Sequence, residues 1–420
     1  MKFTLSKSIL YQLLFTLCVT VVFLNKYELT FAVWTIVALF TLSRFYSVTI
    51  LKYVACFAAI FVIAFIVSFF KESKSYYFIR DITYMVKPIL GLLVGYQICK
   101  KSENKTIAIV IYTGVFVSMA HLGIILFTMV SNLHLSFHQI RAASGYFSDF
   151  EIYALILLLF SDKFNFHIGK YKKMILVLIV VVSSVLYFSR TNFIQFVILY
   201  IAMKGYFRIT ARSIYYLLIA LGMTLLTYTV IYYSNPRREA KGFEGFLYKV
   251  KISPIEPFKT KINKDDWKDF NDNYRSYENI ITIKQVSNNG TSAIIFGEGL
   301  GSTIDLKRQI WTNDGELIRY IPILHNAFMT VFLKSGLLGV ALSILFIYLL
   351  LKHEKTDLDS VRYINWLLVG SGVFLIVSNW VFLGLYLKLD NKSILIGFLI
   401  AYREILLKQD QQNRGEITNE

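Results

Sequence analysis

Apolar runs long enough to cross a lipid bilayer follow one another along most of this chain, from Ile9 nearly to the C-terminus. A transmembrane helix needs about 20 predominantly apolar residues. With 56% hydrophobic and only 17% charged residues among 420, the chain is also too apolar for a surface that faces water on all sides. Its single long polar interval is Ser234–Leu324. The sequence therefore predicts a polytopic membrane protein and excludes soluble enzymes and nucleic-acid-binding proteins.

The apolar runs predict about twelve transmembrane helices when windows of about 20 residues are read and shorter ones are allowed. The expected ranges are 8–24, 29–43, 47–70, 80–98, 106–131, 148–161, 173–188, 191–203, 213–233, 325–351, 363–385 and 392–407. We therefore expect an all-α fold in consecutive parts. Helices one to nine occupy 1–233, a loop domain 234–324, helices ten to twelve 325–407, and a cytoplasmic tail 408–420.

Basic residues give these helices an orientation. The net charge of +17 comes mainly from Lys and Arg in short loops between apolar runs, and such residues mark the cytoplasmic side of a membrane. Because the predicted number of helices is even, both termini lie on the same side of the membrane, and the charge bias places that side in the cytoplasm. The interval 234–324, which we call the cap, then lies outside the cytoplasm. The cap is too long for a connector, and its mixed charge with Trp267 and Trp311 favours a small folded unit. We expect function to face outward.

Chemistry outside the cytoplasm constrains the substrate. The outer compartment lacks ATP and nucleotide sugars, and the sequence contains no phosphate-binding loop of the type G-x-x-x-x-G-K-[ST]. An enzyme there needs a substrate that was activated beforehand, and lipid-linked diphosphates meet that need because the membrane delivers them with a good leaving group. Arginine suits binding of the diphosphate, since it is permanently charged and bonds phosphate oxygens in a bidentate way. Histidine suits removal of a proton from the attacking hydroxyl.

Candidate arginines lie where the predicted topology meets the outer face. Arg190 occupies the tight turn 188–191 between two predicted helices, Arg275 lies in the segment 274–278 of the cap, and Arg141 precedes the sixth helix. Each is a candidate ligand of the diphosphate. The alternative for Arg190 is an interfacial anchor, because basic side chains snorkel at helix ends. The alternative for Arg275 and Arg141 is a solvated surface charge.

The most specific pattern begins where the cap returns to the membrane. His325 and Asn326 are followed by nine residues and then by Gly336-Leu337-Leu338-Gly339, which fits the pattern H-[NSQ], nine residues, G-x-x-[GTY]. This motif follows a large outer loop between the ninth and tenth of about twelve helices. Together with the upstream Phe188-Ser189-Arg190-Thr191, it resembles the O-antigen ligase/polymerase family of bacterial surface-polysaccharide enzymes.

The resemblance, best from about Arg141 to Gly339, implies a fold, a donor and roles for particular residues. It implies a membrane-embedded, GT-C-like glycosyltransferase fold, an undecaprenyl-diphosphate-linked glycan as donor, and no metal, nucleotide or other cofactor. The family's histidine corresponds to His325, as the base for the acceptor hydroxyl. Its arginines correspond to Arg190 and, most loosely, to Arg275, as ligands of the diphosphate. The alternative for His325 is an interfacial histidine that caps the tenth helix.

Basic residues deep inside predicted helices need an explanation. Burying Lys87 or Lys334 unpaired in a bilayer costs about 3 kcal/mol or more. Arg80 and Lys87 are seven residues apart and hence on one face of the fourth helix, which suits a path for the diphosphate; the alternative is snorkelling or pairing with a carboxylate. The acidic cluster 265–272 and the glycines of 297–301 are better explained by a solvated helix face and a tight turn than by metal and phosphate sites.

The chain is therefore expected to be an enzyme of the bacterial inner membrane with its active site in the periplasm. Gly145-Tyr146-Phe147 before an acidic position favours a polymerase, which transfers the glycan onto the acceptor sugar of another lipid-linked repeat unit. The single large outer loop favours the alternative, a ligase that transfers it onto lipid A-core. A flippase or other carrier is the non-enzymatic alternative. The expected partners are the undecaprenyl-diphosphate-linked oligosaccharide, the bilayer, and a chain-length regulator and a flippase of the same pathway, with no nucleic acid.

Overall fold

The computed structural model describes most of the chain. It covers residues 7–71, 74–102, 106–131, 145, 148–207, 211–238, 243–252, 254, 256, 259–263, 265–311, 315, 317–352 and 356–415. Arg141, one of the candidate diphosphate ligands, lies outside the described residues.

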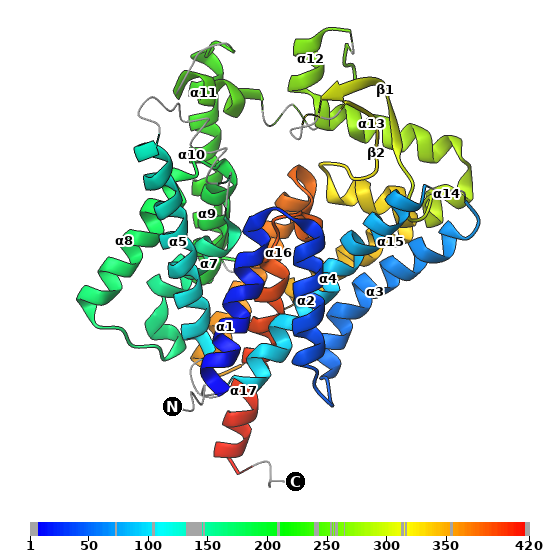
Figure 1. The fold of residues 1–420 in the computed structure, drawn as a ribbon. Helices are drawn as coiled ribbons and strands as arrows, with labels where there is room; N and C mark the ends of the chain where they lie inside the picture. Colours follow the sequence, from blue (N-terminus) through cyan, green and yellow to red (C-terminus); the bar gives the residue numbers. More distant parts are fainter. Residues whose placement is uncertain are drawn as a thin grey trace.

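A bundle of helices makes up most of the described structure (Figure 1). A helix lies in each of the ranges predicted from hydropathy, with shifts at the ends. The helices are α1 (Lys7–Thr20) continued by η1 (Val21–Leu24), α2 (Tyr27–Phe40), α3 (Val48–Ser68), α4 (Ser75–Lys101), α5 (Thr106–Ser131), α7 (Asp149–Leu159), η2 (Ser161–Phe164), α8 (Lys170–Leu186), α9 (Arg190–Met203), α10 (Ala211–Tyr233), α15 (Ala327–Leu351), α16 (Asp359–Val381), η4 (Gly384–Tyr386) and α17 (Lys392–Asn413).

Among the described residues, 7 helices are long and apolar enough to cross a membrane: α1 with η1, α3, α4, α5, α10, α15 and α16. This number supports the prediction of about twelve spans only in part. The helices α2, α7, α8 and α9 are shorter than 18 residues, and α17 carries many charged and amide side chains in its second half. The long apolar helices indicate a multi-pass membrane protein.

The centre of the bundle is the pair α4 and α17. Every residue of 392–403 in α17 is buried. Glycines let the two backbones approach: a Cβ on Gly95 would lie 1.8 Å from the carbonyl oxygen of Ile394, and a Cβ on Gly397 would lie 2.0 Å from that of Leu92. Against this pair pack α2, α3 and α16, and α15 packs in turn against α3 and α16. The helix that follows the His325 motif, α15, therefore belongs to the interior of the bundle.

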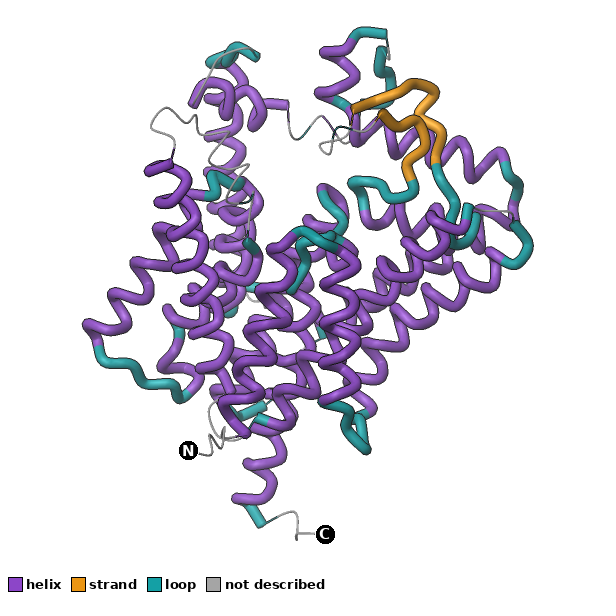
Figure 2. Tube along the Cα trace, viewed as in Figure 1, coloured by secondary structure: helices purple, strands orange, loops and turns teal. Residues whose placement is uncertain are grey.

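The cap folds into short helices and one hairpin. It contains α11 (Phe243–Ile252), α12 (Trp267–Asp272), α13 (Tyr274–Asn288), α14 (Thr291–Phe296) and the antiparallel strands β1 (Ile304–Trp311) and β2 (Leu317–Ile321). In Figure 1, α11, α12 and the hairpin lie at the end of the bundle opposite the start of α1 and the end of α17. Figure 2 shows the hairpin within an otherwise helical structure. The described fold is thus all-α apart from this hairpin.

A shared apolar core joins the cap to α15. Val286 of α13 and the alternate β1 residues Ile304 and Leu306 are buried together with Phe332 and Leu333 of α15. Full burial of a large apolar side chain contributes about 1.5–3 kcal/mol. Packing therefore fixes the cap on the helix that follows the His325 motif.

Candidate functional site

The motif shapes the start of α15 and interrupts it. The side chain of Asn326 caps the helix by accepting a hydrogen bond from the backbone N–H of Met329 at 3.2 Å, as asparagine commonly does at helix N-termini. Within the helix, Gly336 has φ of 65° and ψ of −161°, a conformation that is essentially restricted to glycine. The helical path is therefore broken at Gly336.

The turn 297–301 of the cap docks at this break. The backbone N–H of Glu298 donates to the carbonyl oxygen of Leu333 at 2.7 Å, and that of Gly299 donates to the carbonyl oxygen of Lys334 at 3.0 Å. In an unbroken α-helix these carbonyls would accept from N–H groups four residues further along the same helix. The tight turn predicted for the cap thus also links it to α15 through the backbone.

Close contacts explain why the motif has glycine at Gly336 and Gly339. A Cβ on Gly336 would lie 2.3 Å from the carbonyl oxygen of Ile295 in α14, and a Cβ on Gly339 would lie 1.9 Å from Oγ of Ser335. The backbone of α14 cannot give way, whereas a serine hydroxyl can rotate. Glycine is therefore required more strictly at Gly336 than at Gly339.

His325 lies between this motif and α13. Its backbone N–H donates to Oε2 of Glu278 at 3.1 Å, and its ring Nδ1 lies 3.1 Å from both carboxylate oxygens of Glu278. The ring of Tyr274 meets the imidazole edge-on, with centroids 5.5 Å apart. The side chain of His325 is 52% exposed, whereas that of Glu278 is 1% exposed. The imidazole is thus held by α13 on one side and remains accessible on another.

Arg275, also on α13, faces the carboxylate of Glu256. Its Nη1 lies 3.6 Å from Oε1 of Glu256, and its guanidinium carbon lies 5.3 Å from the ring centroid of Phe382. Burial raises the pKa of Glu256, whereas Arg275, Arg190 and His325 act in the opposite direction. The three residues assigned by the family resemblance therefore lie within electrostatic reach of one carboxylate.

Arg190 begins α9 directly after the short turn predicted between two helices. Its Nη1 donates to the carbonyl oxygen of Lys249 in α11 at 3.0 Å. This contact brings the turn before α9 and the cap together, so Arg190 approaches the site from the bundle while Arg275 approaches from the cap.

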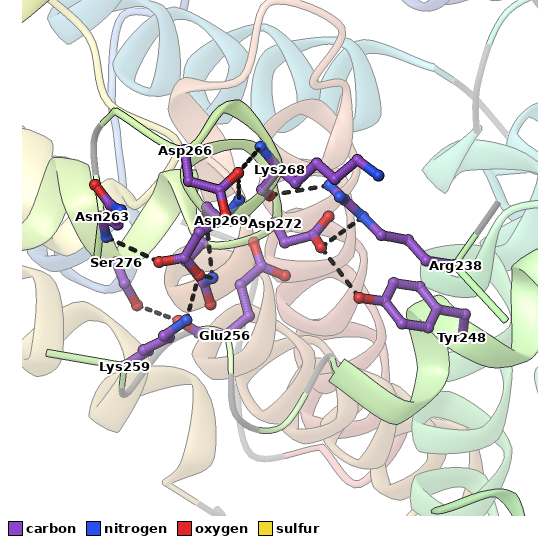
Figure 3. A network of polar contacts seen from close by, with 11 residues as sticks. Arg238, Tyr248, Glu256, Lys259, Asn263, Asp266, Lys268, Asp269, Asp272 and Ser276 are labelled. Atoms are coloured by element: carbon purple, nitrogen blue, oxygen red, sulfur yellow. Dashed lines mark hydrogen bonds and ion pairs between the residues drawn. The ribbon is translucent and has the colours of Figure 1, made fainter. Parts of the chain in front are cut away.

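A polar network holds the cap segment that carries Glu256 (Figure 3). Arg238 pairs with Asp272 at 2.9 Å, and the hydroxyl of Tyr248 donates to the same carboxylate at 3.1 Å. The hydroxyl of Ser276 on α13 donates to the carbonyl oxygen of Glu256. These contacts connect α11 and the segment of Glu256 with α12 and α13, which follow later in the cap sequence.

The side chains of Asp266, Asp269 and Asp272 have partners within the protein. Asp266 caps α12 by accepting from the backbone N–H of Lys268 at 2.8 Å. Asp269 pairs with Lys259, which holds the pKa of this carboxyl below its ordinary value. Within the part of the chain that the structure describes, no group of His, Cys, Asp and Glu side chains could hold a metal ion. The cluster therefore contributes to the folding of the cap.

The lysines inside the bundle have partners of their own. Nζ of Lys334 lies 2.5 Å from Oδ2 of Asp81, and both side chains are 1% exposed. Nζ of Lys87 donates to the carbonyl oxygens of Leu387 and Lys388 at 2.7 and 2.8 Å. For Lys334 the structure thus agrees with the alternative from the sequence, pairing with a carboxylate, while Lys87 is satisfied by backbone.

Arg80 and Lys87 do not form an open path in this arrangement. The guanidinium carbon of Arg80 lies 5.9 Å from the ring centroids of both Tyr77 and Tyr84, and Lys87 is 1% exposed. A diphosphate cannot reach an ammonium group that is buried and already bonded. Lys87 therefore has a structural role in this conformation, in contrast to the expected path.

Sequence reasoning missed Glu278 and Glu256. Glu278 has a weak signal, because it lies four residues after Tyr274 and three after Arg275, which puts all of them on neighbouring positions of a helix surface. Glu256 lies between α11 and α12, where no spacing pattern points to it.

Comparison with known proteins adds no family. A scan against protein-family models finds no match, and a search of curated proteins finds none that matches the chain significantly. The family resemblance therefore stays a prediction.

Proposed function

We propose that this protein transfers a glycan from undecaprenyl diphosphate to the acceptor sugar of another lipid-linked repeat unit, at the outer face of the bacterial inner membrane. The observation that carries the proposal is the pairing of Arg275 with Glu256 at 3.6 Å, on a carboxyl whose pKa Arg190 and His325 also lower. Cations that act on a carboxylate in this way suit a diphosphate, which carries more negative charge and more acceptor oxygens.

The finer architecture belongs to the same proposal. The chain would cross the membrane twelve times in a GT-C-like arrangement, with both ends in the cytoplasm and the cap in the periplasm. Support comes from the start of α1 and the end of α17, which lie away from the cap (Figure 1), and from the 7 long apolar helices among the described residues.

In the proposed reaction, the hydroxyl oxygen of the acceptor sugar attacks the anomeric carbon of the donor glycan. A C–O bond forms there while the bond between that carbon and the diphosphate oxygen breaks, and undecaprenyl diphosphate leaves with the electron pair. Arg275 and Arg190 stabilise the charge on the leaving group. His325 accepts the proton of the hydroxyl and later releases it to water. The donor is already activated, so the proposal includes no metal, nucleotide or other cofactor.

A ligase that transfers the same glycan onto lipid A-core is the second candidate, favoured by the single large outer unit of the chain. Both enzymes would use the same donor and the same residues. The carrier alternative drew its support from the buried lysines. Lys334 and Lys87 have partners inside the bundle, so the feature that favoured a carrier has a structural explanation.

Replacement of His325 by alanine tests the proposed chemistry. We expect the variant to insert into the membrane while long glycan chains disappear from gels, because the acceptor hydroxyl loses its base. His167→Ala is the matched control, since His167 is an exposed histidine between η2 and α8, and it should leave the chains unchanged. Long chains at the wild-type level in His325→Ala would overturn the proposal.

The lipid A-core of a deletion strain separates the two enzymes. A single repeat unit attached to the core indicates a lost polymerase, because ligation still proceeds. Bare core indicates a lost ligase.

A further inference from the structure

Glu278 is a deeply buried charged group in direct contact with His325. Its side chain is 1% exposed, and its carboxylate faces both the backbone N–H and the ring Nδ1 of His325 at 3.1 Å. A buried carboxylate without donors is costly. The burial of Glu278 therefore depends on the donors that His325 places beside its carboxylate.

This contact determines which ring nitrogen carries the hydrogen. An ionised carboxylate only accepts hydrogen bonds, so a neutral imidazole that faces Glu278 through Nδ1 must carry its hydrogen there. The lone pair then remains on Nε2, the nitrogen that Glu278 does not contact. Because the His325 side chain is 52% exposed, Nε2 is the atom that can meet an incoming hydroxyl.

Tyr274 restrains the imidazole from a second direction. Tyr274 and Glu278 are four residues apart on α13, so their side chains share one face of the helix. Burial, followed by the nearby Glu278 carboxylate and a hydrogen bond to it, raises the pKa of the Tyr274 phenol. The phenol therefore stays protonated while its ring packs edge-on against the imidazole.

We infer that Glu278 is a positioning residue that keeps His325 as the Nδ1–H tautomer and holds its Nε2 toward the acceptor. The catalytic meaning of this inference rests on the proposed function. Carboxylate–histidine pairs orient the ring and stabilise the imidazolium that forms when Nε2 takes up a proton. Among the described residues, the imidazole also acts electrostatically on the Glu256 carboxyl, as do Arg275 and Arg190.

The first test compares Glu278→Gln with Glu298→Gln in the full-length protein, supplied with the lipid-linked repeat unit in lipid nanodiscs. Glu298 is a matched control, because it is a cap glutamate that is 7% exposed and accepts from the amides of Gln285 and Asn289 at 2.9 and 2.7 Å. We expect Glu278→Gln to lower kcat by about 100-fold with KM for the donor changed less than about twofold. Equal kcat in Glu278→Gln and the wild type would overturn the inference.

The second test needs no activity. In protein labelled with ¹⁵N-histidine, the signals that His325→Ala removes report the tautomer of His325. We expect the Nδ1–H form in the wild type and a smaller share of it in Glu278→Gln; a wild-type ring with its hydrogen on Nε2 would overturn the inference even if Glu278→Gln did not fold. Normal glycan synthesis by His325→Ala would instead remove the proposed function and leave the tautomer assignment standing.

Discussion

Charges are arranged differently in the bundle and at the boundary between bundle and cap. In the bundle, Lys334 with Asp81 has side chains that are 1% exposed, and Lys392 with Asp149 has side chains that are 2% exposed. These are closed pairs, because packed side chains surround both partners. A closed pair leaves no space for a ligand.

At the boundary the pairing is open. The side chain of His325 is 52% exposed and that of Arg275 is 26% exposed. Arg275 meets Glu256 across 3.6 Å, a longer separation than in the closed pair of Lys334 with Asp81, at 2.5 Å. The difference indicates that charge alone does not identify a binding residue in a membrane protein. What matters is whether another anion can replace the partner of the cation.

The largest effect is expected from breaking a closed pair. Lys334→Met leaves the Asp81 carboxylate buried without its partner, which should lower the free energy of unfolding by about 3–5 kcal/mol. Adding Asp81→Asn should recover much of that loss, since no buried charge then remains. Denaturation of the purified variants measures both. If Lys334→Met kept wild-type stability but lost glycan synthesis, Lys334 would be a functional cation. The distinction between closed pairs in the bundle and open pairs at the boundary would then fail.

A smaller effect is expected where the cap docks on α15. Gly336→Ala places a side chain at a positive φ and against the Ile295 carbonyl oxygen, with a backbone cost of about 1–3 kcal/mol before any clash. We expect faster proteolysis within the cap and a lower unfolding temperature. Gly222→Ala in α10 is the control, because a Cβ there meets nothing within 4 Å. Equal proteolysis of the two variants would contradict a docking role for Gly336.

Glu256→Gln removes the negative charge that faces Arg275 at the open boundary. The neutral amide no longer competes with a diphosphate for Arg275, so the affinity for inorganic diphosphate should rise by about two- to fivefold. Isothermal titration of the purified protein measures it. Glu244→Gln is the control, since Glu244 is a cap glutamate that pairs with the exposed Arg237. Weaker binding in Glu256→Gln would mean that Glu256 helps to bind the ligand.

The smallest effect is a pH dependence of the same binding. Burial raises the pKa of Glu256, so this carboxyl takes up a proton at a higher pH than an ordinary glutamate. As the pH falls through that raised pKa, Glu256 becomes neutral and stops competing with the diphosphate. The difference in affinity between the wild type and Glu256→Gln should therefore close on acidification. Titrations at several pH values measure it, and a constant difference would rule out competition by Glu256.

Helix positions were largely predictable, and the discrepancies have local causes. Apolar runs are a property of neighbouring residues, so they marked the helices that the structure contains. The predicted range 80–98 became α4, Ser75–Lys101, because polar residues at its ends lie outside an apolar window although the backbone remains helical. The hairpin at 304–321 was missed because its short alternating pattern lies in a polar interval.

Candidate site residues were predictable one at a time. His325, Arg190 and Arg275 each followed from a motif or a position, and the role of Asn326 as a helix cap matches its chemistry. Their approach to Glu256 was not predictable, since it requires α9, α13 and the start of α15 to meet in space. The structural partners of Lys87 were likewise hidden, because they are backbone carbonyls of a segment 300 and 301 residues away.

The sequence by itself determined that this chain enters the membrane repeatedly and that an apolar helix follows the cap, since apolar content is a property of neighbouring residues. Only the tertiary structure decided which carboxylate meets which cation. Lys334 pairs with a residue 253 positions away and His325 with one 47 positions away. Such pairs form through the packing of distant helices, and that packing depends on many contacts at once that no local pattern contains.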